Sequence, residues 1–138
     1  MILVLLGTQN NSFHRLLEEV QKNIEKGIIK EEVIVQAGYT KFKSESMKIF
    51  SLISKRKLEQ YQKDANLIIT HGGVGSIITS IKDEKKVIAV PRLKKYSEHV
   101  NDHQLDIIKE FAQKGYIIGI NDVLELGDAI KTVNEFIP

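Results

Sequence analysis

Three polar or glycine-rich segments carry the residue types that could bind an anion or a sugar. They are Gly7–Ser12 (GTQNNS), His71–Ser76 (HGGVGS) and Glu98–Gln104 (EHVNDHQ). The three glycines of the second segment allow a backbone to approach a ligand closely. A glycine turn that leads into a helix also presents free N–H groups at the positive end of the helix dipole, which suits phosphate. These segments therefore predict phosphate binding, with His71 as a hydrogen-bond donor.

Each segment also has a purely structural interpretation. The first is an ordinary strand-to-helix turn if Ser12 caps the helix, and Asn101 or Asp102 could cap another helix in the same way. The second is a tight turn with a packed histidine. GGVGS matches neither the dinucleotide fingerprint nor a Walker A loop. His99 and His103 have a metal-ligand spacing, but no third ligand lies nearby in the sequence, so no metal is expected.

Short apolar runs alternate with amphipathic stretches along the chain, and these elements must position the three segments. Helices are predicted over roughly 12–26, 54–64, 100–113 and 123–137, and from the end of HGGVGS through about Ile81. The alternation predicts a doubly wound α/β fold with a mainly parallel, Rossmann-like sheet. Ligands of such sheets bind at the carboxyl ends of the strands. The predicted strands are Ile2–Leu6, Val33–Val35, Leu67–Thr70, Val87–Val90 and Tyr116–Ile120, with Met47–Ile53 ambiguous.

Composition excludes several classes of protein. The 138 residues suggest one domain, 1–138, with 42% hydrophobic and 28% charged residues. Because there is no cysteine, disulfide scaffolds, thiolate metal sites and cysteine nucleophiles are excluded, and a cytoplasmic location is expected. No apolar run approaches the ~18 residues that span a bilayer. The net charge of +2 does not argue for nucleic-acid binding.

Lysine is nevertheless unevenly distributed. The basic groups are Lys41, Lys43 and Lys48, then Lys55, Arg56 and Lys57, and finally Arg92, Lys94 and Lys95. They are either solvated faces or surfaces that attract phosphates, an acidic partner or an anionic membrane.

Four stretches, in this order, resemble the C-terminal, donor-binding domain of family 28 glycosyltransferases, which have the GT-B fold. They are GTQNNSF from Gly7, QAGYTKF from Gln36, NLIITHGGVGSI from Asn66 and VIAVPRLKKYSEHVNDHQ from Val87. The chain looks most similar to stand-alone catalytic subunits of two-part transferases. These include a eukaryotic UDP-GlcNAc transferase subunit and bacterial capsule or exopolysaccharide subunits that transfer β-1,4-galactose or glucuronic acid.

The resemblance implies a role for each segment. The donor sugar would contact Asp102, His103 and Gln104, and uracil would lie near Ile53–Lys55. Thr79 stands where relatives often carry an acidic residue for the ribose, and it lacks the charge of a carboxylate. The donor diphosphate would contact Gly7, Thr8, Gln9, Asn10, His71, Gly72, Gly73, Gly75 and Ser76.

The same resemblance implies an inverting displacement that needs no metal or other cofactor, with the UDP-sugar as substrate. His14 and His103 are candidates for the general base, which the partner could also supply. Because the chain supplies one half of a GT-B enzyme, a membrane-anchored partner subunit is expected to bring the acceptor half. That partner would recruit the chain to the inner face of the membrane, and the isolated chain could form a homodimer.

The favoured activity at this point is transfer of a hexose, β-1,4-galactose, to a lipid-linked saccharide acceptor in capsule or exopolysaccharide synthesis. The alternatives are a UDP-GlcNAc transferase subunit and a non-catalytic nucleotide-sugar-binding or regulatory module. A UDP-sugar epimerase is a third alternative, although the acid/base carboxylates that it would need are not evident in the sequence.

Overall fold

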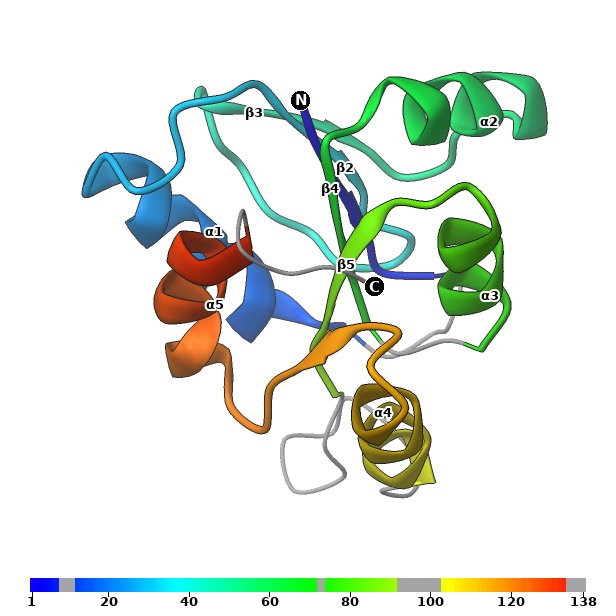
Figure 1. Cartoon of the computed structure of the whole chain (residues 1–138). Helices are drawn as coiled ribbons and strands as arrows, with labels where there is room; N and C mark the ends of the chain where they lie inside the picture. The colour runs from blue at the N-terminus through cyan, green and yellow to red at the C-terminus, as the bar shows by residue number, and fades with distance from the viewer. Residues whose placement is uncertain (8–11, 72–73, 92–102, 134–138) are drawn as a thin grey trace.

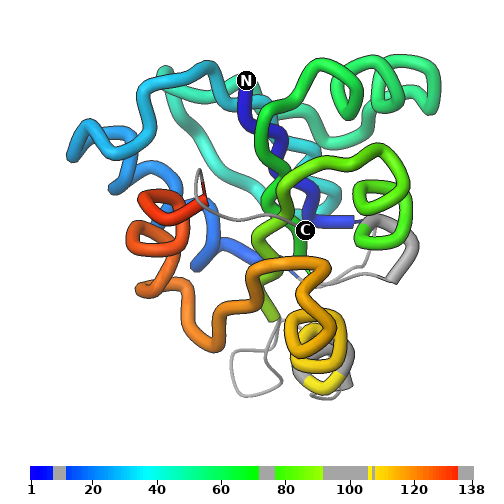
Figure 2. Tube along the Cα trace, viewed as in Figure 1, coloured from blue at the N-terminus to red at the C-terminus, as the bar shows by residue number. Residues whose placement is uncertain are grey.

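The computed structural model of this chain describes residues 1–7, 12–71, 74–91 and 103–133, and Figure 2 draws the remainder in grey. Six parallel strands form one sheet in the order β3-β2-β1-β4-β5-β6. This is the strand order of a doubly wound nucleotide-binding sheet, so the predicted fold class is confirmed. The strands are β1 (Ile2–Leu5), β2 (Val33–Gln36), β3 (Met47–Phe50), β4 (Leu67–Thr70), β5 (Lys86–Ala89) and β6 (Ile118–Gly119).

Helices cover both faces of this sheet. In Figure 1, α1 and α5 lie on one face, and α2, α3 and α4 lie on the other. The helices are α1 (His14–Glu25), α2 (Lys55–Asp64), α3 (Val74–Lys82), α4 (His103–Gln113) and α5 (Leu126–Thr132), with a short 3₁₀ turn η2 (Val123–Glu125) before α5. Among the described residues, no helix is long and apolar enough to cross a bilayer.

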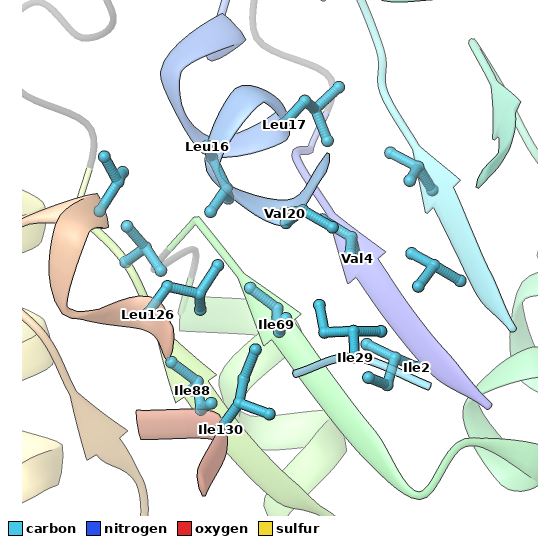
Figure 3. Close-up of a cluster of buried hydrophobic side chains, with 14 of the residues drawn as sticks. Ile2, Val4, Leu16, Leu17, Val20, Ile29, Ile69, Ile88, Leu126 and Ile130 are labelled. Carbon is cyan, nitrogen blue, oxygen red and sulfur yellow. The ribbon is translucent and has the colours of Figure 1, made fainter. Parts of the chain in front are cut away.

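The main hydrophobic core fills the space between the sheet and the α1–α5 layer. Figure 3 shows how Val4 and Ile69 of the sheet meet Leu16 and Val20 of α1 and Ile130 of α5. All residues of β1, β2 and β4 are buried, as expected for strands covered on both faces. Two smaller clusters lie on the opposite face, one beneath α2 and one beneath α3 and α4. The double layer of helices therefore leaves the strand ends as the places where a ligand can approach.

Two helices, α1 and α4, end at glycines with a left-handed backbone. Gly27 and Gly115 have φ of 76° and 77°, which is the left-handed conformation that ends a helix in a Schellman turn. After α4, the N–H of Tyr116 donates to the carbonyl of Phe111 at 3.2 Å. Because this turn uses Tyr116, the last strand begins at Ile118 rather than at the predicted Tyr116.

Three other element predictions can be compared with the structure. Ser54 caps the helix predicted at 54–64, since its hydroxyl accepts from the N–H of Lys57 at 3.3 Å. The ambiguous stretch at Met47–Ile53 contains the edge strand β3. The Ser12 cap of the structural alternative is not formed, because Phe13 is the N-cap residue of α1 and no side-chain cap bond is present there.

Candidate functional site

The point where the chain order of the strands reverses lies between β1 and β4. These neighbours pair in register from Ile2 with Leu67 to Leu5 with Thr70. The chain leaves β1 toward α1 on one face and leaves β4 toward α3 on the other (Figure 1). Such a divergence opens a crevice at the carboxyl ends of the strands, which is the usual ligand position in doubly wound sheets. The first two predicted segments begin at this point.

Gly7 and His71 pack directly against each other across this divergence. A Cβ built on Gly7 would lie 2.6 Å from His71 Nε2 and 2.9 Å from Cε1. Gly7 also has a φ of +75°, which side-chain-bearing residues rarely adopt. His71 is 5% exposed, and its N–H donates to the carbonyl of Leu5 at 3.1 Å. Only glycine fits this position, and the histidine is held against the turn.

Gln36 supports the same turn from the neighbouring strand β2. Its Nε2 donates to the carbonyl of Gly7 at 3.3 Å, and its own carbonyl accepts from the N–H of Leu6 at 3.0 Å. The side chain of Gln36 is buried, and its bond to Gly7 is partly buried. Gln36 therefore holds the Gly7 carbonyl at the end of the first described segment.

Thr70, the last residue of β4, has a buried hydroxyl group with no hydrogen-bond partner among the residues that the structure describes. Ile69 belongs to the core on the α1–α5 face and Ile68 to the cluster beneath α2. Because side chains alternate along a strand, Thr70 lies on the same face as Ile68. Buried hydroxyls normally find a partner, and an unpaired one is a cost that a native structure retains for a reason. Its position, one residue before His71, makes Thr70 part of the candidate site.

Thr40, rather than Ser12, accepts a hydrogen bond at the start of α1. Its Oγ1 accepts from the N–H of Phe13 at 2.8 Å, across 27 residues of sequence. The bond joins the loop after β2 to the start of α1, and both groups are buried. Local capping rules could not identify this residue, because the acceptor is distant in the sequence.

Replacing Thr40 with valine is expected to lower the free energy of unfolding by about 1 kcal/mol, the typical cost of a lost helix cap. The valine keeps the shape of the side chain but leaves the Phe13 N–H without its acceptor. Urea denaturation measures this change, and Thr132→Val is the control, because that hydroxyl donates to carbonyls within its own helix. An equal loss in both variants would contradict the capping role.

The remaining predicted site residues fall into two groups. Thr8, Gln9, Asn10, Gly72, Gly73 and Asp102 lie outside the described residues. Gly75 and Ser76 lie in the first turn of α3, and His103 and Gln104 begin α4. The described structure thus brings Gly7, His71 and the start of α3 to one edge, and the roles of the other residues stay predictions.

His14 and Thr79 lie on helix surfaces. The side chain of His14 is 50% exposed, with Nδ1 2.7 Å from Glu18 Oε1, and its ring lies 5.1 Å from that of Phe42. Thr79 is exposed on α3. Neither placement assigns the general base or the ribose contact, and both remain predictions.

A hollow of about 550 Å³ lies at the opposite, amino edge of the sheet. Two of its charged groups, Lys85 and Glu31, already serve the fold. Lys85 Nζ donates to the carbonyls of Lys63 and Ala65 at 2.6 and 3.0 Å. The amino group of Met1 lies 2.8 Å from Glu31 and lowers the pKa of that carboxyl, with help from Asn66. Among the described side chains, no three His, Asp or Glu residues are grouped as metal ligands.

Comparison with known proteins identifies the family to which the chain belongs. The model of the glycosyltransferase family 28 C-terminal domain matches residues 1–135. The chain belongs to this family. The resemblance seen in the four sequence stretches is thereby confirmed, and it extends over nearly the whole chain.

Two curated relatives are described as the UDP-N-acetylglucosamine transferase subunit ALG13. The Candida albicans protein is 30% identical over 81 residues, which cover 59% of this chain and 26% of that protein. The Candida glabrata protein is 26% identical over 117 residues, which cover 83% of this chain and 56% of that protein. The chain therefore spans between about a quarter and just over half of the length of these relatives.

Two solved structures share the fold. The glycotransferase of kitacinnamycin superposes with a TM-score of 0.66 at 16% identity, covering 97% of this chain and 34% of that one. An NMR structure of ALG13 superposes with a TM-score of 0.62 at 18% identity, covering 99% of this chain and 86% of that one. At these identities the likeness concerns the fold alone.

Proposed function

We propose that this chain is the donor-binding, catalytic subunit of a UDP-sugar-dependent glycosyltransferase. The observation that carries the proposal is the contact between Gly7 and His71 at the reversal point of the sheet. It joins the first two predicted phosphate-binding segments into one surface. Membership of the glycosyltransferase family supports a nucleotide sugar as the ligand of that surface.

The chemistry asked of this surface is stabilisation of a leaving group. As the glycosidic bond breaks, negative charge develops on the diphosphate of UDP. Backbone N–H groups at the start of α3, together with the His71 ring, would stabilise that charge. Donors that are already oriented avoid reorganisation during the reaction, which is commonly the largest electrostatic contribution to catalysis.

The choice of sugar changes when the relatives are considered. The sequence favoured β-1,4-galactose and capsule or exopolysaccharide synthesis, whereas both curated relatives are described as UDP-N-acetylglucosamine transferase subunits. We therefore place UDP-GlcNAc first and UDP-galactose second. A lipid-linked saccharide acceptor and metal-independent inversion belong to the same proposal.

The word subunit in the names of both relatives supports a partner. The partner would supply the acceptor-binding half of the cleft and, where His14 and His103 do not serve, the general base. In this proposal the partner is membrane-anchored, and the complex works at the inner face of the membrane.

A thermal-shift panel tests donor binding directly. We expect UDP and UDP-GlcNAc to raise the melting temperature, because a ligand at 100 times its Kd stabilises the folded state by about 2.7 kcal/mol. The melting-temperature shifts with UDP-galactose, UDP-glucose and UDP-glucuronic acid rank the sugars by affinity. Uridine, which lacks the diphosphate, is the control. Equal shifts with uridine and UDP would contradict a diphosphate site, and a larger shift with UDP-galactose would reverse the order of sugars.

Catalysis is separated from simple binding by transfer of labelled sugar in the complex reconstituted with its partner. His71→Ala is expected to reduce kcat by about 100-fold, which is the usual effect of removing one oriented donor from an anionic transition state. Circular dichroism of the variant controls for its folding. Transfer that is unaffected by the change would favour a non-catalytic binding module.

A further inference from the structure

The carboxyl ends of β2 and β3 carry an exposed surface that extends beyond the residues predicted to contact the donor. We propose that this surface docks on an anionic lipid bilayer. We call it the β2–β3 face, and define it by the exposed apolar side chains of Tyr39, Phe50 and Leu52 and the exposed basic side chains of Lys41, Lys43, Lys48, Lys55, Arg56 and Lys57.

The apolar part of the β2–β3 face is unusually open. Tyr39 is 62% exposed and Leu52 is 74% exposed. They line one hollow of about 330 Å³ together with Gly38, Lys41 and Ser51. Two backbone hydrogen bonds hold the two loops side by side, from Ala37 N–H to the Phe50 carbonyl at 2.8 Å and from Gly38 N–H to the Ser51 carbonyl at 2.9 Å. The exposed side chains therefore project from a fixed base.

The charge of the chain is concentrated on the same face. Residues 38–57 contain six of the 20 Lys and Arg residues but only one of the 18 Asp and Glu residues, Glu45. The segment therefore has a net charge of +5, and the rest of the chain has −3. Among the described ion pairs, Lys48 alone of these cations has an acidic partner, Glu32 at 3.2 Å. The positive charge on this face is available to an external anion.

Folding stability does not explain the placement of three of these cations. Lys55, Arg56 and Lys57 form the first turn of α2. That turn contains no acidic residue. The positive end of the helix dipole lies there, so anions stabilise this turn and cations destabilise it. An arrangement that opposes the stability of its own helix is expected where the charge serves an interaction outside the chain.

A lipid surface fits this composition better than a protein partner does. Lysine is depleted at the centres of protein interfaces, because fixing a long, strongly hydrated side chain is costly. A layer of anionic headgroups instead attracts several lysines without requiring one geometry for each. Aromatic and aliphatic side chains between those lysines can then enter the boundary between the headgroups and the acyl chains.

The position of the β2–β3 face relates this docking to the donor site. Gln36, at the end of β2, bonds to Gly7, and Thr40, in the next loop, bonds to Phe13 before α1. The face and the candidate donor site thus share the carboxyl edge of the sheet. If the proposed function holds, docking turns this edge toward the surface that carries a lipid-linked acceptor.

Vesicle sedimentation of the whole chain, without nucleotide or partner, tests the proposal. We expect binding to phosphatidylcholine vesicles that contain phosphatidylglycerol, little binding to pure phosphatidylcholine, and loss of binding at high salt. The variant Lys41→Gln/Lys43→Gln/Lys57→Gln is expected to bind about 100-fold more weakly, since each cation near an anionic surface contributes roughly a fivefold factor. Tyr39→Ser/Leu52→Ser is expected to lose about tenfold or more through its apolar area.

The matched control removes the same charge elsewhere. Lys109→Gln/Lys114→Gln/Lys131→Gln changes three exposed lysines on α4, just after α4 and on α5, away from the β2–β3 face, and should leave vesicle binding nearly unchanged. An equal loss in the control, or no binding to phosphatidylglycerol, would overturn the proposal. A dimer that forms without vesicles, and that the Tyr39→Ser/Leu52→Ser substitutions dissociate, would also overturn the proposal. The β2–β3 face would then bind a second copy of the chain. Because no UDP-sugar is present, failure here leaves the donor-site proposal standing.

Discussion

Replacing Gly7 with alanine is expected to lower the free energy of unfolding by about 2–5 kcal/mol, and to abolish the stabilisation by UDP. The left-handed backbone accounts for about 1–2 kcal/mol of this loss. The new methyl group accounts for the rest, because overpacking typically costs about 1–3 kcal/mol. It would lie 2.6 Å from His71 Nε2 and would have to displace the ring or the turn. Urea denaturation measures the stability, and the UDP-induced melting shift measures the site.

Gly27→Ala is a closely matched control. Gly27 has a φ of +76°, and a Cβ there would meet no atom within 4 Å. This variant should therefore lose only the backbone component, about 1–2 kcal/mol, and retain the UDP shift. The double variant Gly7→Ala/His71→Ala removes the ring that the methyl group would strike, and a coupling of about 1 kcal/mol or more is expected. Equal losses at Gly7 and Gly27, with no coupling, would show that the ring contact is unimportant.

Replacing Thr70 with valine is expected to raise the free energy of unfolding by about 1–3 kcal/mol, the cost of a buried hydroxyl that lacks a partner. The hydroxyl of Thr70 is buried and has no partner among the described residues, and valine offers a methyl group of similar shape. Thr40→Val is the internal comparison, because that hydroxyl accepts a hydrogen bond and its loss should destabilise. Urea midpoints of the two variants should move in opposite directions.

The same Thr70 variant should bind UDP more weakly, by about 2- to 10-fold, which corresponds to one neutral hydrogen bond. The Thr70 hydroxyl is a buried donor that lowers the stability of the fold and lies one residue before His71. A ligand contact, or a rearrangement when the ligand binds, best explains why it is retained. A variant that is destabilised would show that the hydroxyl has a partner in solution. A variant that is stabilised but binds UDP normally would separate Thr70 from the donor site.

The sequence was sufficient for the fold because its strands are covered on both sides. Runs such as Ile2–Leu6 and Leu67–Thr70 are continuously apolar, as buried parallel strands are, and the helices between them have clear apolar faces. Met47–Phe50 was ambiguous for the opposite reason. It is the edge strand, and its alternation of buried Met47 with exposed Lys48 is too short to identify.

The site could be predicted only as segments. Gly7 and His71 were both recognised as phosphate-binding candidates, but their contact depends on the pairing of β1 with β4, which periodicity does not specify. Gln36 and Thr70 were assigned no role, although each is a polar residue that ends an apolar run. A search for polar residues at the ends of apolar runs would have identified both Gln36 and Thr70. Thr40 carries no such signal, because its partner Phe13 is distant in the sequence.

An NMR titration of the ¹⁵N-labelled chain with UDP tests most directly whether the reversal point between β1 and β4 is the donor site. We predict saturable amide shifts at Gly7, at His71 and in the first turn of α3, and little change at the amino-edge hollow around Glu31, Asn66 and Lys85. Shifts confined to that hollow, or no saturable shifts at Gly7 and His71, would contradict the proposal.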